Sequence, residues 1–185
     1  MVATVIIERL TGSTPTRTAI TGINTRANAE DAHSTGDTAN PIEIPSGADN
    51  FSFWVNTQLN ATVAPDNLLD NIEWFTDGAN SYGTGITAVV AQAALASYTE
   101  APGTDGVTGT VLTDANYTGG TLTPATPTDM FAFVTGSPLA VTGSTSGTGA
   151  FGNMVIFQIV VASSATPGTK PSGGPEDITW RFDET

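Results

Sequence analysis

The residue types best suited to chemistry surround His33, the one histidine of the chain. It lies in the segment EDAHSTGD, where Glu30, Asp31 and Asp37 offer oxygen ligands that would join it at a metal ion. One imidazole lacks the paired or i, i+4 spacing of a metal-binding set. No G-x-S-x-G motif accompanies it for nucleophilic catalysis. We therefore predict an exposed loop histidine and no metal site.

Carboxylates and tryptophans form the next pattern with chemical potential. A glycosidase needs two carboxylates across a cleft, usually beside aromatic sugar platforms. The carboxylates cluster as Asp66, Asp70 and Glu73, and as Asp177, Asp183 and Glu184, while the tryptophans are Trp54, Trp74 and Trp180. Trp74 and Trp180 fall on apolar faces of expected strands, which favours a place in the core. Acidic loops such as the one at Asp105 suit calcium, but no ligand-loop pattern accompanies them. We predict no catalytic residue, no cofactor and no enzyme.

The composition excludes several classes of partner. The 185 residues include 18 acids against five basic side chains, which gives a net charge of −13. Five Lys and Arg side chains cannot neutralise a row of phosphates. We therefore expect that the chain binds neither nucleic acid nor an anionic membrane surface. The absence of cysteine excludes disulfides and thiol chemistry.

The elements that carry these residues follow a period of two, interrupted by Gly-rich turns. We predict an all-β chain, an antiparallel β-sandwich of jelly-roll or immunoglobulin-like type, as a single domain over residues 1–185. Asn50–Val63 is the clearest strand, with one apolar face and one polar face, so we expect one buried face. Trp54 stands on the polar face and needs a cover, from a loop or from another subunit.

Other segments are assigned with the same pattern. We expect little helix, one turn at Pro65–Asp70, and we interpret Ile86–Tyr98 as a strand that runs into a loop, although its Ala content also fits a helix. Long loops are expected at Asn24–Asn40 and Ala96–Gly109, held by neighbouring subunits. The further strands predicted are Val2–Leu10, Arg17–Ile23, Pro41–Ile44, Asn71–Thr76, Ile86–Ala91, Gly109–Thr113, Met130–Thr135, Asn153–Ala162 and Asp177–Asp183.

Three stretches carry a family resemblance. They are the aromatic-rich NFSFWVNTQL, the segment Asn71-Ile72-Glu73-Trp74-Phe75, and, after a long apolar strand, the ending Ile178-Thr179-Trp180-Arg181-Phe182-Asp183-Glu184. Together they resemble a group of small tailed-phage virion proteins, over about a quarter of the chain. The resemblance implies a β-sandwich structural subunit that is associated with the capsid or with the tail. Of these we expect a capsid decoration or auxiliary protein in many copies. Its partners would be itself and other virion proteins such as the major capsid protein. Its location would be the virion, after synthesis in the host cytoplasm.

Subunit contacts are expected at the terminal strands, residues 1–10 and 177–183. The candidate contact residues are Val2, Val5, Ile7, Trp54, Trp180 and Phe182. A fibre or pilin-like subunit, in which Val2–Leu10 completes a neighbour's sheet, is a second structural interpretation. A carbohydrate-binding adhesin is a third, with Trp54, Tyr82 and Tyr117 facing sugar. A hydrolase that uses Asp66 and Asp70 comes last.

Overall fold

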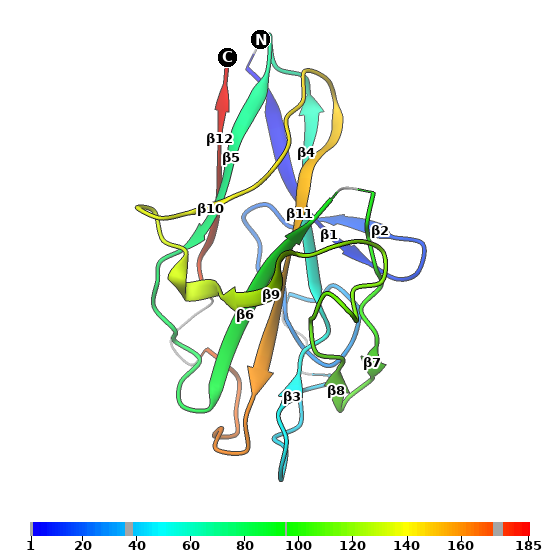
Figure 1. Ribbon diagram of the computed structural model, residues 1–185, viewed down its shortest axis with the longest axis vertical. Coiled ribbons are helices and arrows are strands. Elements are labelled where there is room, and N and C mark those ends of the chain that lie inside the picture. Colours follow the sequence, from blue (N-terminus) through cyan, green and yellow to red (C-terminus); the bar gives the residue numbers. More distant parts are fainter. Residues whose placement is uncertain (1, 36–38, 95, 172–175) are drawn as a thin grey trace.

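Two antiparallel sheets face each other in a sandwich-like, all-β arrangement (Figure 1). The computed structural model describes residues 2–35, 39–94, 96–171 and 176–185. The larger sheet has the order β2-β1-β4-β11-β6-β9, with β3 also paired to β11. Its strands are β1 (Thr4–Thr11), β2 (Thr16–Ala19), β3 (Asn50–Phe51), β4 (Val55–Val63), β6 (Ile86–Ala93), β9 (Thr123–Asp129) and β11 (Gly149–Val161).

The smaller sheet has three strands in the order β10-β5-β12. They are β5 (Leu69–Thr76), β10 (Leu139–Ala140) and β12 (Ile178–Glu184). A short pair, β7 (Gly103–Thr104) with β8 (Thr108–Gly109), and one turn of 3-10 helix, η1 (Met130–Ala132), complete the elements. In the part of the chain that is described, no helix has the length and apolar character needed to cross a bilayer.

The main core lies between the two sheets. Val55 and Leu59 of β4 and Phe157 of β11 face Leu69 and Trp74 of β5, all at most 5% exposed. The strand alternation of the sequence produces this layer directly, because every second side chain of a strand points to the same face.

A second core covers the opposite face of the larger sheet. There Trp54, Ile156 and Met154 pack with Leu112 and Tyr117, all at most 2% exposed, beneath the chain between β6 and β9. The expectation that Asn50–Val63 has one buried face is therefore wrong.

The polar face of that segment is buried as well as far as Gln58, and side-chain hydrogen bonds replace the water it loses. Asn56 and Gln58 are fully buried. The Tyr117 hydroxyl donates to Asn56 Oδ1 over 3.2 Å, and Gln58 Nε2 donates to the Gly152 carbonyl over 3.0 Å. Buried amides are tolerated only when they are paired in this way.

Two predicted strands are shorter or interrupted, since β2 ends at Ala19 and residues 52–54 separate β3 from β4. Four other predicted elements differ more strongly. Pro41–Ile44 forms no strand, in keeping with prolines at 41 and 45 that have no N–H to donate to a ladder. Pro65–Asp70 forms no helical turn, and β5 begins at Leu69. Met130–Thr135 begins as η1, because Asp129 accepts the Phe131 N–H in a cap. Gly109–Thr113 leaves its strand after one residue.

A buried side chain explains that early departure. The Leu112 N–H donates to Gln158 Oε1 over 2.7 Å, and the Thr110 carbonyl accepts Gln158 Nε2 over 2.8 Å. Gln158 thus occupies backbone groups that a partner strand would otherwise use. The Thr- and Pro-rich strand β9 had no apolar signal to predict it.

The terminal strands are both used inside their own chain. Strand β1 is paired on one side with β2 and on the other with β4. Strand β12 pairs with β5. A fibre that donates Val2–Leu10 to a neighbour would have to take β1 out of this sheet.

Candidate functional site

His33 lies beside a buried cation. Arg9 is fully buried on β1. Its Nη1 donates to Thr25 Oγ1 over 2.9 Å and to the Arg26 carbonyl, and His33 Nδ1 lies 3.1 Å from the same Thr25 hydroxyl. Burial and then the charge of Arg9 lower the pKa of His33. This arrangement ties the segment after β2 to the sheet, which is a structural role for the histidine.

The neighbouring carboxylates also hold the segment after β2 in place. Asp31 Oδ2 accepts the Gly12 N–H over 2.7 Å, and burial raises the pKa of this carboxyl against the opposing effects of that bond and of Arg9. Glu30 accepts hydrogen bonds from Asn28 and Asn40. Asp37 lies outside the described residues. Among those described, no group of three or more acids and histidine is arranged to hold a metal ion.

Internal contacts also hold both long loops. In the described part of Asn24–Asn40 they are the Arg9 and Asp31 bonds given above. In Ala96–Gly109, the Tyr98 hydroxyl donates to the Gly12 carbonyl over 3.0 Å. Contacts within the chain therefore hold the described parts of these loops, and a further contact with neighbouring subunits stays a prediction.

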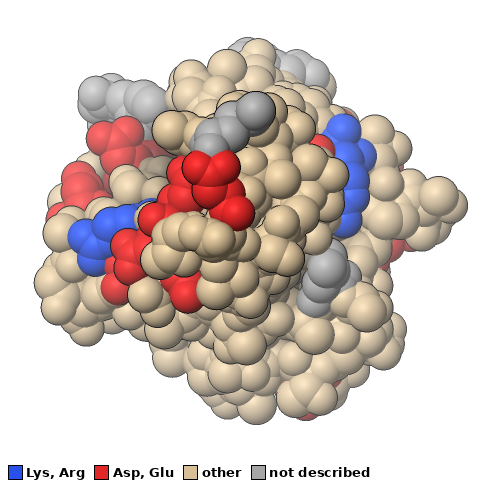
Figure 2. All heavy atoms as spheres, turned by 90° about the horizontal axis from the view of Figure 1, so that it is seen from above, with Lys and Arg blue, Asp and Glu red and all other residues tan. Residues whose placement is uncertain are grey.

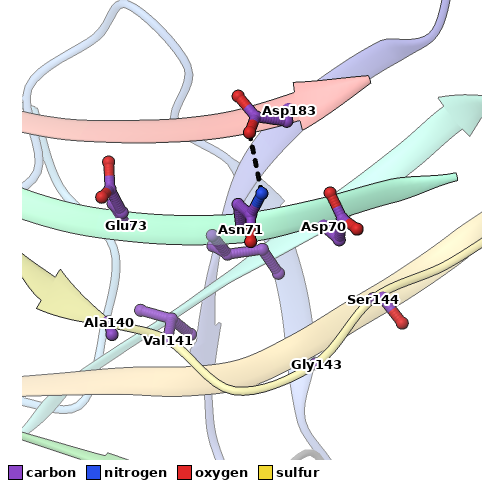
Figure 3. Close-up of a pocket in the computed structure, with 9 residues that line it drawn as sticks. Asp70, Asn71, Glu73, Ala140, Val141, Gly143, Ser144 and Asp183 are labelled. Atoms are coloured by element: carbon purple, nitrogen blue, oxygen red, sulfur yellow. Dashed lines mark hydrogen bonds between the residues drawn. The ribbon is translucent and has the colours of Figure 1, made fainter. Parts of the chain in front are cut away.

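The carboxylates of β5 and β12 line a shallow recess (Figure 3). Asp183 accepts a 2.8 Å hydrogen bond from Asn71 Nδ2, and Glu73 forms an ion pair with Arg181. Asp70 lies at the same recess, whereas Asp66 is not part of its lining. No aromatic side chain lines it among the described residues, so the two-carboxylate arrangement with sugar platforms is not assembled here.

Trp54 is not available for a subunit contact. Its ring is fully buried, its Nε1 donates to the Thr110 carbonyl over 2.8 Å, and it packs on Tyr117 with ring centroids 5.5 Å apart. The cover that it needs comes from a loop of its own chain. Tyr117 is fully buried and Tyr82 is half-buried beside Phe131, so the three aromatics proposed for an adhesin form no exposed platform.

The remaining contact candidates divide by strand. Val2 precedes β1 and is 80% exposed, the largest value among the exposed large hydrophobic side chains described. Val5 and Ile7 of β1 are half-buried against the main core. Trp180 and Phe182 of β12 are also half-buried against that core, so part of each ring faces solvent.

A half-open groove of about 950 Å³ adjoins β12. Ile178 and Trp180 line it from β12, Ile7 lines it from β1, and Ile20 and Ile42 line it from the chain beyond β2. The sequence reasoning missed the two loop isoleucines. The sequence feature that could have indicated them is an otherwise polar region with isoleucine at positions 20, 23, 42 and 44.

Charge is distributed unevenly over the end of the molecule that carries both termini. Most of this surface is neither acidic nor basic, and the acidic side chains gather mainly on one side (Figure 2). The acids Asp70, Glu73 and Asp183 line the recess over β5, which β12 and the segment 140–144 flank, and Arg181 is ion-paired with Glu73 (Figure 3). Comparisons with models of protein families, with curated proteins and with solved structures found no match.

Proposed function

We propose that this chain is a non-enzymatic structural subunit of a phage-like particle, a capsid decoration or auxiliary protein present in many copies. The observation that carries the proposal is the incomplete cover of the sandwich at β12. The inward face of this strand, with Trp180 and Phe182, remains half-exposed, whereas Leu69 and Trp74 on the adjacent β5 are fully buried. An assembly would cover this face with a neighbouring chain.

Two further properties support the same role. The described parts of the long loops are held by contacts within the chain, so a subunit of this kind would bring those parts to the particle already folded. The net charge of −13 suits the outside of a shell, where it would discourage non-specific adhesion. The resemblance of the strand at Asn71–Phe75 and of the final strand to small virion proteins points in the same direction.

Quantitative mass spectrometry of purified particles tests the proposal. Particles from the phage whose genome encodes the chain should contain it in many copies, at a fixed ratio to the major capsid protein. Electron microscopy of those particles with a tagged chain should place it on shells, and filaments would instead select the fibre interpretation. Particles that lack the chain altogether would refute a structural role in the virion.

A further inference from the structure

Strand β12 is an open edge of the smaller sheet. In the order β10-β5-β12 it is the last strand, and its seven residues pair with β5 alone. No backbone hydrogen bond joins Ile178–Glu184 to any other strand among the described residues. A strand in this position presents a row of N–H and C=O groups that another extended backbone can satisfy.

The apolar groove begins on the open side of this strand. Ile178 and Trp180 form one wall, and no residue of β5 lines the groove. Ile7 forms the floor from β1, and Ile23 and Ile44, which are 49% and 38% exposed, line it from the chain beyond β2. A fourth strand added to β12 would therefore cover apolar side chains and pair with backbone groups at the same time.

Between Ile178 and Phe182 the edge lacks the prolines and inward charges that usually prevent strand addition. Natural edges are protected by proline, by bulges and by charged side chains, above all those that point inward. Strand β12 contains no proline, and its inward residues Ile178, Trp180 and Phe182 are apolar. Glu184 at its end shares their face and accepts the Ala3 N–H over 2.8 Å. Its Arg181 and Asp183 belong to the other, exposed face. The register shift opposite this strand arises on β5, where Asn71 has a φ of 47°.

Charge defines the ends of the occupant. Glu176 and Asp177 precede β12, and Asp183 and Glu184 end it, so carboxylates stand at both ends of the edge. The two cations in the groove lining, Arg26 and Lys170, belong to other segments than the edge itself. A second copy would bring another net charge of −13 to this edge, which disfavours self-pairing.

We propose that β12 and the adjoining groove bind an extended polypeptide segment of a different protein, which adds a fourth strand to the sheet β10-β5-β12. The segment carries apolar residues at alternate positions, to fill the groove, and Lys or Arg at its ends, opposite the carboxylates. The inference rests on the proposed function, because the particle would supply the partner.

A titration of the full-length chain with synthetic peptides tests this. The probe has alternating Val and Thr between terminal pairs of Lys, and NMR of the ¹⁵N-labelled chain reports binding. We expect shift changes and slowed amide exchange at Ile178–Glu184. A control peptide with Pro in place of two Thr residues cannot complete the ladder and should bind at least about tenfold more weakly. A peptide with Glu in place of Lys should also bind more weakly at low salt.

Two variants on the same strand locate the contact. Ile178→Gln changes a side chain that lines the groove and should weaken binding about tenfold. Thr179→Gln changes an exposed residue on the outward face and should alter binding by less than about twofold. If Ile178→Gln loses its dispersed NMR spectrum because it does not fold, the comparison of the Thr and Pro peptides on the unchanged chain still tests strand addition.

Three results would overturn the inference. They are equal binding of the Pro peptide, shift changes away from β12, and self-association of the chain through β12 in sedimentation. The count of copies in purified particles is independent of all three. Abundant copies without peptide binding would refute strand addition alone, whereas absence from particles would refute the proposed function.

Discussion

The two fully buried tryptophans allow one hydrogen bond to be measured against a matched control. Trp54 and Trp74 both have 0% exposure, so Trp→Phe at either position removes a similar area from contact and leaves a similar void. They differ at the indole nitrogen. Trp54 Nε1 donates to the Thr110 carbonyl over 2.8 Å, whereas Trp74 Nε1 has no partner among the described residues.

The expected magnitudes follow from that difference. Trp54→Phe loses a hydrogen bond worth about 0.5–1.5 kcal/mol, and the Thr110 carbonyl keeps its bond from Gln158, so no acceptor is stranded. Trp74→Phe removes an unpaired buried N–H, which relieves about 1–3 kcal/mol. The free energy of unfolding should therefore fall further for Trp54→Phe than for Trp74→Phe, by about 1.5–4.5 kcal/mol.

Urea denaturation followed by circular dichroism measures both values, with m-values compared to verify that the transitions match. Trp54→Ala, which removes the whole ring, should cost about 3–5 kcal/mol and calibrates the scale. Equal losses for the two Phe variants, or a larger loss for Trp74→Phe, would refute the reasoning about the indole nitrogens.

Three further predictions concern other parts of the chain. His33→Gln should lose less stability than the wild type as the pH falls from about 7.5 to 5.5. The pKa of His33 is lowered in the folded chain, whereas in the unfolded chain it has its ordinary value of about 6.5. The unfolded chain therefore binds the proton first as the pH falls, and this protonation favours unfolding. Parallel urea curves at each pH would contradict this. Gly109→Ala should cost about 1–3 kcal/mol, since its Cβ would lie 2.2 Å from the Ser52 carbonyl oxygen. Gly147→Ala meets nothing within 4 Å and should stay within about 0.5 kcal/mol, so equal melting temperatures would be evidence against that clash. Arg181→Gln breaks an ion pair whose arginine is 48% exposed, and a loss above about 1 kcal/mol in denaturation would be unexpected.

Local pattern was enough to predict much of the strand content. The apolar run at Asn153–Ala162 and the aromatic ending at Asp177–Asp183 each correspond to a strand within a few residues, and the alternation in Asn50–Val63 corresponds to β4 with the short β3 before it. The strand interpretation of Ile86–Tyr98 is confirmed over Ile86–Ala93, because pairing with β11 outweighs the helix preference of its alanines.

The same pattern could not show which surfaces are buried. Polar side chains such as Asn56, Gln58 and Gln158 look solvent-facing in a sequence, because a buried amide is stable only with partners from distant segments. Those partners lie 46 to 106 positions away for Gln158. The same limitation placed Trp54 at a subunit contact, although a loop from its own chain covers it.

The candidate site divides in the same way. The sequence alone determined that the chain is all-β, acidic and closed by an aromatic strand, since composition and a period of two are local properties. Only the tertiary structure decided that Ile178 and Trp180 border a groove shared with Ile7, Ile20 and Ile42. Whether a strand is central or at an edge depends on which other strands pair with it, and such pairing is a property of the whole fold.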